Sequence, residues 1–121
     1  MKRAGLLMIL AFFSISLHAQ LSNTKWKITL QLENPTETFF DFGKDSLKVF
    51  VLADSSLLET CLFTEKEGEM SILKVKGISN CEGQAGKYKF EIHNDQLVLK
   101  LISDSCSDRA EVLDNDVLTR K

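Results

Sequence analysis

Histidine is scarce in this 121-residue chain, which has only two. His18 lies in an apolar N-terminal stretch, so His93 is the only histidine that follows it. One histidine without a matched serine, cysteine or second metal ligand supports neither a catalytic triad nor a catalytic zinc site. We therefore expect a protein that is not an enzyme and has no cofactor or metal centre. His93 is expected to be a solvated turn residue.

An excess of basic residues is also lacking. The chain has 15 Lys and Arg against 17 Asp and Glu, a net charge of −2. Without Lys2 and Arg3, 13 basic residues remain against 17 acidic ones, a net charge of −4. Nucleic acids and anionic membranes are bound by basic patches, so we expect neither as a partner.

No apolar run is long enough to span a bilayer comfortably, and the longest one begins the chain. It runs from Leu6 to Leu17 after Lys2 and Arg3, and a small residue, Ala19, follows it. This pattern predicts a secretory signal peptide over residues 1–19, with an uncleaved anchor as the alternative. Residues 20–121 would then be one exported domain, periplasmic or extracellular, with no stable membrane anchor after cleavage.

Cysteine is limited to three residues, Cys61, Cys81 and Cys106. If Asn94-Asp95 forms a two-residue turn, facing residues of the surrounding hairpin sum to 189, and Cys81 and Cys106 sum to 187. They would lie almost opposite each other, which predicts a structural disulfide in an oxidising compartment. Cys61 is expected to be a small buried apolar residue. The alternatives are an intermolecular disulfide, a reactive thiol, or a bond to one of the other two cysteines.

The rest of the chain alternates apolar and polar residues with the period of two that is typical of half-buried strands. No segment has a convincing helical period. Regular short strands joined by short turns favour an antiparallel up-and-down meander that closes into a barrel, with a two-sheet sandwich as the alternative. The eight expected strands cover residues 26–33, 38–42, 47–52, 57–64, 70–76, 87–93, 97–101 and 117–120.

Two segments carry a resemblance to a known family. One is Asn23-Thr24-Lys25-Trp26 at the start of the first strand. The other runs from Cys81 through Gly86-Lys-Tyr88 and alternating leucines to Asp104-Ser-Cys-Ser-Asp-Arg109. The chain resembles small secreted bacterial lipocalin-like proteins of the calycin group, although Thr24 stands where the lipocalin pattern has glycine. The resemblance implies an all-β, eight-stranded antiparallel up-and-down barrel in which Arg109 stacks on Trp26 and closes one end.

The resemblance also implies a small apolar ligand inside the barrel. Candidate cavity residues on the expected inward rows are Phe40, Phe42, Val49, Val51, Tyr88, Phe90, Leu97 and Leu99. These side chains are bulky, so a barrel filled by its own core is the alternative. A second hypothesis is a secreted protein-binding module, such as a calycin-type protease inhibitor. It rests on an outward patch of Phe39, Phe50 and Leu52 and on the loops 77–86 and 103–116.

Overall fold

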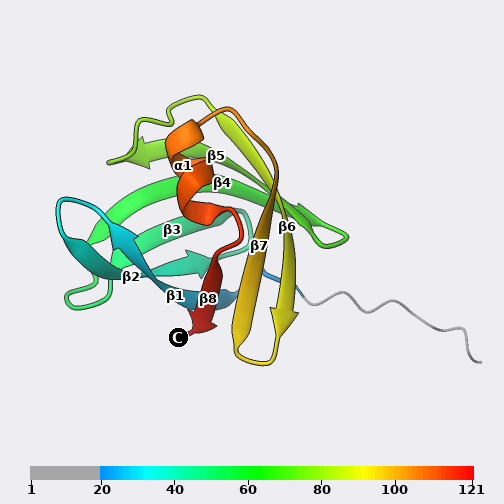
Figure 1. Cartoon of the computed structure of the whole chain (residues 1–121), viewed down its shortest axis with the longest axis horizontal. Coiled ribbons are helices and arrows are strands. Elements are labelled where there is room, and N and C mark those ends of the chain that lie inside the picture. The colour runs from blue at the N-terminus through cyan, green and yellow to red at the C-terminus, as the bar shows by residue number, and fades with distance from the viewer. Residues whose placement is uncertain (1–19) are drawn as a thin grey trace, which may run out of the picture.

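Eight antiparallel strands close into one barrel, and each strand pairs with its neighbours in chain order (Figure 1). This computed structural model describes residues 20–121, so the predicted signal peptide lies outside the described residues. The structure confirms the predicted all-β, up-and-down, eight-stranded barrel. The strands are β1 (Thr24–Gln31), β2 (Pro35–Phe42), β3 (Ser46–Val51), β4 (Leu57–Lys66), β5 (Glu69–Gly77), β6 (Ala85–His93), β7 (Gln96–Asp104) and β8 (Val117–Arg120).

The β6–β7 hairpin has the register that the sequence predicts. His93 pairs with Gln96 across the turn, and Asn94 takes the left-handed backbone conformation (φ 56°) that asparagine tolerates well. The register then shifts at a bulge between Lys87 and Tyr88. The extra residue of a bulge turns the side chains beyond it to the other face of its strand. The residues that pair beyond this bulge therefore differ from those of an ideal hairpin.

The segment after β7 contains a helix that the sequence analysis did not predict. Helix α1 (Ser107–Leu113) has only seven residues, and Leu113 is its one buried side chain. Two turns with a single buried position leave no readable helical period. In Figure 1, α1 lies beside β7 and leads down into β8.

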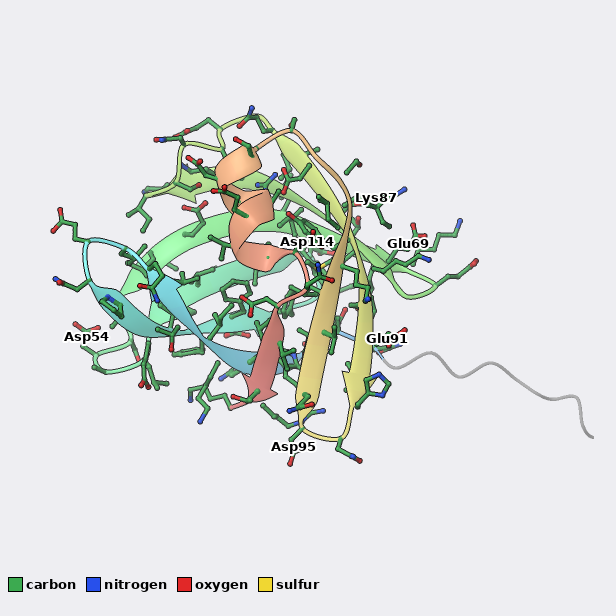
Figure 2. The ribbon with its side chains drawn as sticks, viewed as in Figure 1. Asp54, Glu69, Lys87, Glu91, Asp95 and Asp114 are labelled. Atoms are coloured by element: carbon green, nitrogen blue, oxygen red, sulfur yellow. A yellow bond between two sulfur atoms is a disulfide. The ribbon has the colours of Figure 1, made fainter. Side chains whose placement is uncertain are left out.

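Strand β8 is short, so it joins the two sides of the barrel only near one end. All eight residues of β1 pair with β2, but only Trp26 and Lys27 pair with β8. Beyond Val98, β7 no longer pairs with β8, and the segment after α1 forms hydrogen bonds with it instead. There the Leu101 N–H donates to Asp114 (2.9 Å), which Figure 2 labels beside the lower end of α1. The barrel is therefore sealed by strand pairing at one end and covered by α1 at the other.

The sealed end is filled by large side chains. Trp26 is fully buried, and the guanidinium of Arg120, its pairing partner on β8, lies 4.4 Å from the centre of its ring. The predicted stack of Arg109 on Trp26 is therefore wrong. Arg109 lies on α1 at the other end, because barrel closure brings β8, and not the segment before it, beside β1.

The start of the described chain also closes this end. Leu21 is fully buried in the core, and the Glu65 carboxylate accepts the N–H groups of Leu21 (2.9 Å) and Ser22 (2.8 Å) and the Ser22 hydroxyl. These bonds satisfy backbone donors that burial would otherwise leave unpaired. Among residues 20–121, no helix is long and apolar enough to cross a membrane.

Candidate functional site: a cavity at the open end of the barrel

A cavity of about 250 Å³ lies at the end of the barrel that α1 covers. Its apolar wall comes from the five strands β1 to β5 and from α1. This volume lies below the range of roughly 300–1,000 Å³ that is usual for drug-sized ligands. The apolar lining includes Leu30, Phe40, Leu47, Val49, Leu58, Ile72 and Leu113.

Two of the eight predicted cavity residues line the cavity and six do not. Phe40 and Val49 line the cavity. Phe42, Tyr88, Phe90, Leu97 and Leu99 belong to the packed core, and Val51 is half-buried outside the cavity wall. The barrel is therefore filled by its own side chains at its sealed end and hollow beneath α1. Strand alternation predicts which side chains point inward but not their height along the barrel.

The mouth of the cavity is apolar and exposed. Leu32, Ile78 and Val112 all line the cavity, yet their exposed fractions are 40%, 57% and 40%. They come from the turn between β1 and β2, the β5–β6 loop and α1. Exposed apolar residues scattered singly are common, but a group that continues into an apolar cavity is typical of a binding site.

A disulfide joins Cys81 and Cys106, as predicted, with their Cα atoms 5.4 Å apart. Cys81 lies in the β5–β6 loop and lines the cavity, while Cys106 directly precedes α1. The bond thus fixes the loop and the helix to each other across the open end. A structural disulfide is typical of proteins in oxidising compartments.

A buried ion pair lies beneath α1. Arg109 donates to Asp104 from Nε (2.8 Å) and Nη2 (2.7 Å), and Nη2 also donates to the Gln84 carbonyl (2.8 Å). The Asp104 side chain is fully buried and that of Arg109 is 10% exposed. Tyr88 donates its hydroxyl to the same carboxylate. Burial alone would raise the pKa of Asp104, but the bonds from Arg109 and Tyr88 outweigh it and hold that pKa below its usual value.

A glycine makes room for this pair. A Cβ at Gly86 would lie 2.6 Å from an Asp104 carboxylate oxygen and 3.0 Å from Nη2 of Arg109. Any other residue at this position would displace the ion pair, so Gly86 is part of the site. In the sequence, Gly86 stands out only as part of a family pattern.

One nitrogen of Arg109 is left over. Nη1 is buried and has no hydrogen-bond partner among residues 20–121. Arg109 also lines the cavity. Because the guanidinium is planar and its Nε–Nη2 edge faces Asp104, the two N–H bonds of Nη1 point away from that carboxylate.

The loop between β5 and β6 is held by a buried lysine that the sequence analysis missed. Lys74 continues the inward row of Met70 and Ile72, and its ammonium donates to the carbonyls of Gly77 (2.9 Å) and Ser79 and to Glu82 (2.8 Å). A hydrogen bond from Lys74 lowers the pKa of Glu82. The signal was present in the sequence as a charged residue on an inward row.

Cys61 is a free, buried thiol in the cavity wall. The prediction of a small buried residue is confirmed, and a bond to either of the other two cysteines is excluded. Burial, with a further contribution from the negative charge of Glu59, raises the pKa of the thiol to about 11. Such a thiol is almost entirely protonated at neutral pH and therefore a weak nucleophile.

The predicted outward patch is largely covered. Phe39 points out of the barrel but is only 7% exposed, because it stacks on Phe50 (centroids 5.1 Å apart) and the ammonium of Lys121 lies 4.7 Å from its ring centre. Elsewhere the outer surface carries charged side chains such as Glu69, Lys87 and Glu91 (Figure 2), together with exposed apolar side chains such as Leu62 and Val75. His93 is exposed and bonded to Glu91 (2.9 Å), as expected of a turn residue.

Comparisons with protein-family models, curated proteins and solved structures give no match to this chain. Within residues 20–121, no group of three or more His, Cys, Asp or Glu side chains is arranged to hold a metal ion.

Proposed function

We propose that this protein is an exported, lipocalin-like carrier that binds one small apolar molecule in the open end of its barrel. The observation that carries the proposal is the apolar cavity with an exposed apolar mouth. Transfer of an apolar molecule from water to such a wall is favoured by about 25 cal/mol per Å² of buried surface.

Export is supported by two independent features. The basic and apolar start of the chain has the pattern of a signal peptide. A structural disulfide such as that between Cys81 and Cys106 is typical of proteins in oxidising compartments. The resemblance to lipocalin-like proteins rests on the segment Asn23-Thr24-Lys25-Trp26 and on the segment from Cys81 to Arg109, and the eight-stranded barrel is compatible with it.

The protein-binding alternative has less support. It rests on an outward patch of Phe39, Phe50 and Leu52 and on the loops 77–86 and 103–116, and the side chains of the patch are buried or half-buried. The cavity therefore favours a carrier over a protease inhibitor.

Native mass spectrometry tests the carrier proposal. The mature protein is purified gently from its own exported fraction, and its native mass is compared with its mass after denaturation. We expect a native mass that is larger by one small molecule and returns to the chain mass on denaturation. A bare native mass, together with no binding of apolar dyes to the refolded protein, would contradict the proposal.

A further inference from the structure

The edge of β1 that faces β8 is only partly paired. β8 pairs with Trp26 and Lys27 of β1. The same register would next join Thr29 to Val117, but within residues 20–121 Val117 pairs with Val98 of β7 alone. In Figure 1 the two strands diverge from their paired ends, since β1 runs toward the β1–β2 turn and the chain before β8 runs to α1. The second half of β1 is therefore a free strand edge.

The backbone groups of β1 point alternately toward β2 and toward β8. The Lys25 carbonyl accepts an N–H from the residue that follows β8 (3.0 Å), and the Ile28 carbonyl accepts a hydroxyl from β2 (2.8 Å). The N–H and C=O groups of one residue in an antiparallel strand point to the same side, and the side alternates along the strand. The backbone groups of Thr29 and Gln31 therefore point to the β8 side, where neither residue has a strand partner in the described chain.

Open space borders both of these residues. A groove of about 370 Å³ lies between β1 and the start of β8, with Thr29 on one wall and Val117 on the other. Gln31, nearer the end of the strand, lines the cavity that α1 covers. The side chains of Thr29 and Gln31 are both exposed. An extended chain that enters from solvent therefore reaches the unpaired N–H and C=O groups of this edge.

The charges around the free edge are mainly negative. Glu37 and Asp116 line the groove, and Asp108 lines the cavity. Lys27 is the cation in the lining of the groove. The guanidinium that lines the cavity, that of Arg109, is already paired with a buried carboxylate. Charge complementarity at this edge therefore favours a basic partner.

We propose that the free edge of β1 binds an extended basic peptide segment of another protein, which adds as a strand antiparallel to β1. Exposed strand edges bind peptides in this way because the peptide backbone supplies the missing hydrogen bonds. Residues opposite Thr29 and Gln31 have their side chains on the outer face of the barrel, the face of Glu37. The inference goes beyond the carrier function, because the peptide lies along β1 and not inside the cavity.

The test uses the whole mature protein and a fluorescent peptide of alternating lysine and valine, capped at both ends. With lysines on the outer face, the lysine backbone N–H groups point at β1 and the valine N–H groups point away. One variant peptide carries N-methyl groups on the lysine backbone nitrogens. Its matched control carries the same number on the valine nitrogens. A third peptide has glutamate in place of lysine. Fluorescence anisotropy measures each dissociation constant.

We expect the lysine–valine peptide to bind and methylation of its lysine nitrogens to weaken binding about 10-fold, because two hydrogen bonds to β1 are lost. Methylation of the valine nitrogens leaves the affinity unchanged. The glutamate peptide binds more weakly than the lysine peptide, and the difference shrinks at high salt because ions screen the exposed charges.

Two variants of the protein place the peptide on β1. Thr29→Pro removes the N–H that faces the peptide and none that bonds to β2, and an edge strand accepts proline at such a position. It is expected to weaken binding of the lysine–valine peptide about 5-fold, while Thr29→Ala, which keeps the N–H, leaves it unchanged.

Hydrogen exchange of the wild type replaces these variants if Thr29→Pro fails to fold. The N–H groups of Thr29 and Gln31 should exchange rapidly in the free protein and slowly with bound peptide. Those of Ile28 and Leu30, which face β2, should be protected in both states.

The outcomes separate this inference from the carrier function. Equal weakening by both methylated peptides, or unchanged exchange at Thr29 and Gln31 with saturating peptide, overturns strand addition. Binding of the glutamate peptide as tight as that of the lysine peptide overturns the basic class, and no binding of any peptide overturns the site. Binding of an apolar dye, measured in parallel on the same protein, reports on the carrier function alone.

Discussion

The two ends of the barrel share the same strands but are closed in different ways. At the sealed end, β8 pairs with β1, Trp26 and Leu21 are buried in the interior, and the partly exposed Arg120 stacks on the Trp26 ring. At the open end, α1 and a disulfide-bonded loop cover a cavity. The short strand β8 reaches β1 only at the sealed end, and the cavity lies at the other end, where α1 and the loop take the place of strand pairing.

The largest effect is expected from the sealed end. Trp26→Ala should lower the free energy of unfolding by about 3–5 kcal/mol, because a large buried ring is lost and its cavity is not filled. Urea unfolding measures the change. Leu62→Ala, which replaces a side chain that is 53% exposed, is the control. It should change the free energy of unfolding by less than about 0.5 kcal/mol. Similar small changes in both variants would refute the assignment of Trp26 to the sealing core.

The second-largest loss of stability is expected from removal of the disulfide. Cys81→Ala/Cys106→Ala opens a link between residues 25 apart, and a loop of this length predicts a loss of about 3 kcal/mol. Hydrogen exchange should become faster in the β5–β6 loop and α1 than at the sealed end. Cys61→Ala keeps the disulfide and should cost about 1 kcal/mol. Uniformly faster exchange at both ends would contradict the local role of the disulfide.

The ion pair beneath α1 predicts a dependence on pH. The pKa of Asp104 lies below its usual value in the folded protein, so its contribution to stability is present above the unfolded pKa and is lost as the pH falls through the folded pKa. Asp104→Asn should cost about 2 kcal/mol at neutral pH, and the difference from wild type should shrink below about pH 4. Urea unfolding from neutral to acid pH checks this. A difference that does not change with pH would mean that the charge of Asp104 is not responsible.

The smallest effect should come from filling the cavity. Val49→Phe adds volume beside the cavity and should change the free energy of unfolding by less than about 1 kcal/mol while abolishing binding of an apolar dye. Leu118→Phe adds similar volume to the sealed end and should cost about 1–3 kcal/mol, because no space receives it. Equal costs at both positions would show that the two ends are packed alike.

Local patterns predicted most of the fold. Period-two alternation located all eight strands, and the turn at Asn94 set a register that brought Cys81 and Cys106 together. These features depend on residues near each other in the sequence or on one hairpin. The short helix α1 escaped prediction because seven residues with one buried position show no periodicity.

The candidate site was predicted less well because it depends on contacts between distant strands. The choice between Arg109 and Arg120 as the partner of Trp26 is decided by the register of β8 against β1. Only Phe40 and Val49 of the eight predicted cavity residues line the cavity. Strand alternation predicts which side chains point inward but carries no information on their position along the barrel axis. Lys74 was visible as a charge on an inward row and could have been recognised.

Methyl NMR during titration with octanone tests the contrast between the two ends most directly. The account predicts shifts of the methyl signals of Leu30, Leu58 and Ile72, which line the cavity, and unchanged signals from Leu21 and Leu118 at the sealed end. Shifts of equal size at both ends, or none at saturating octanone, would contradict it.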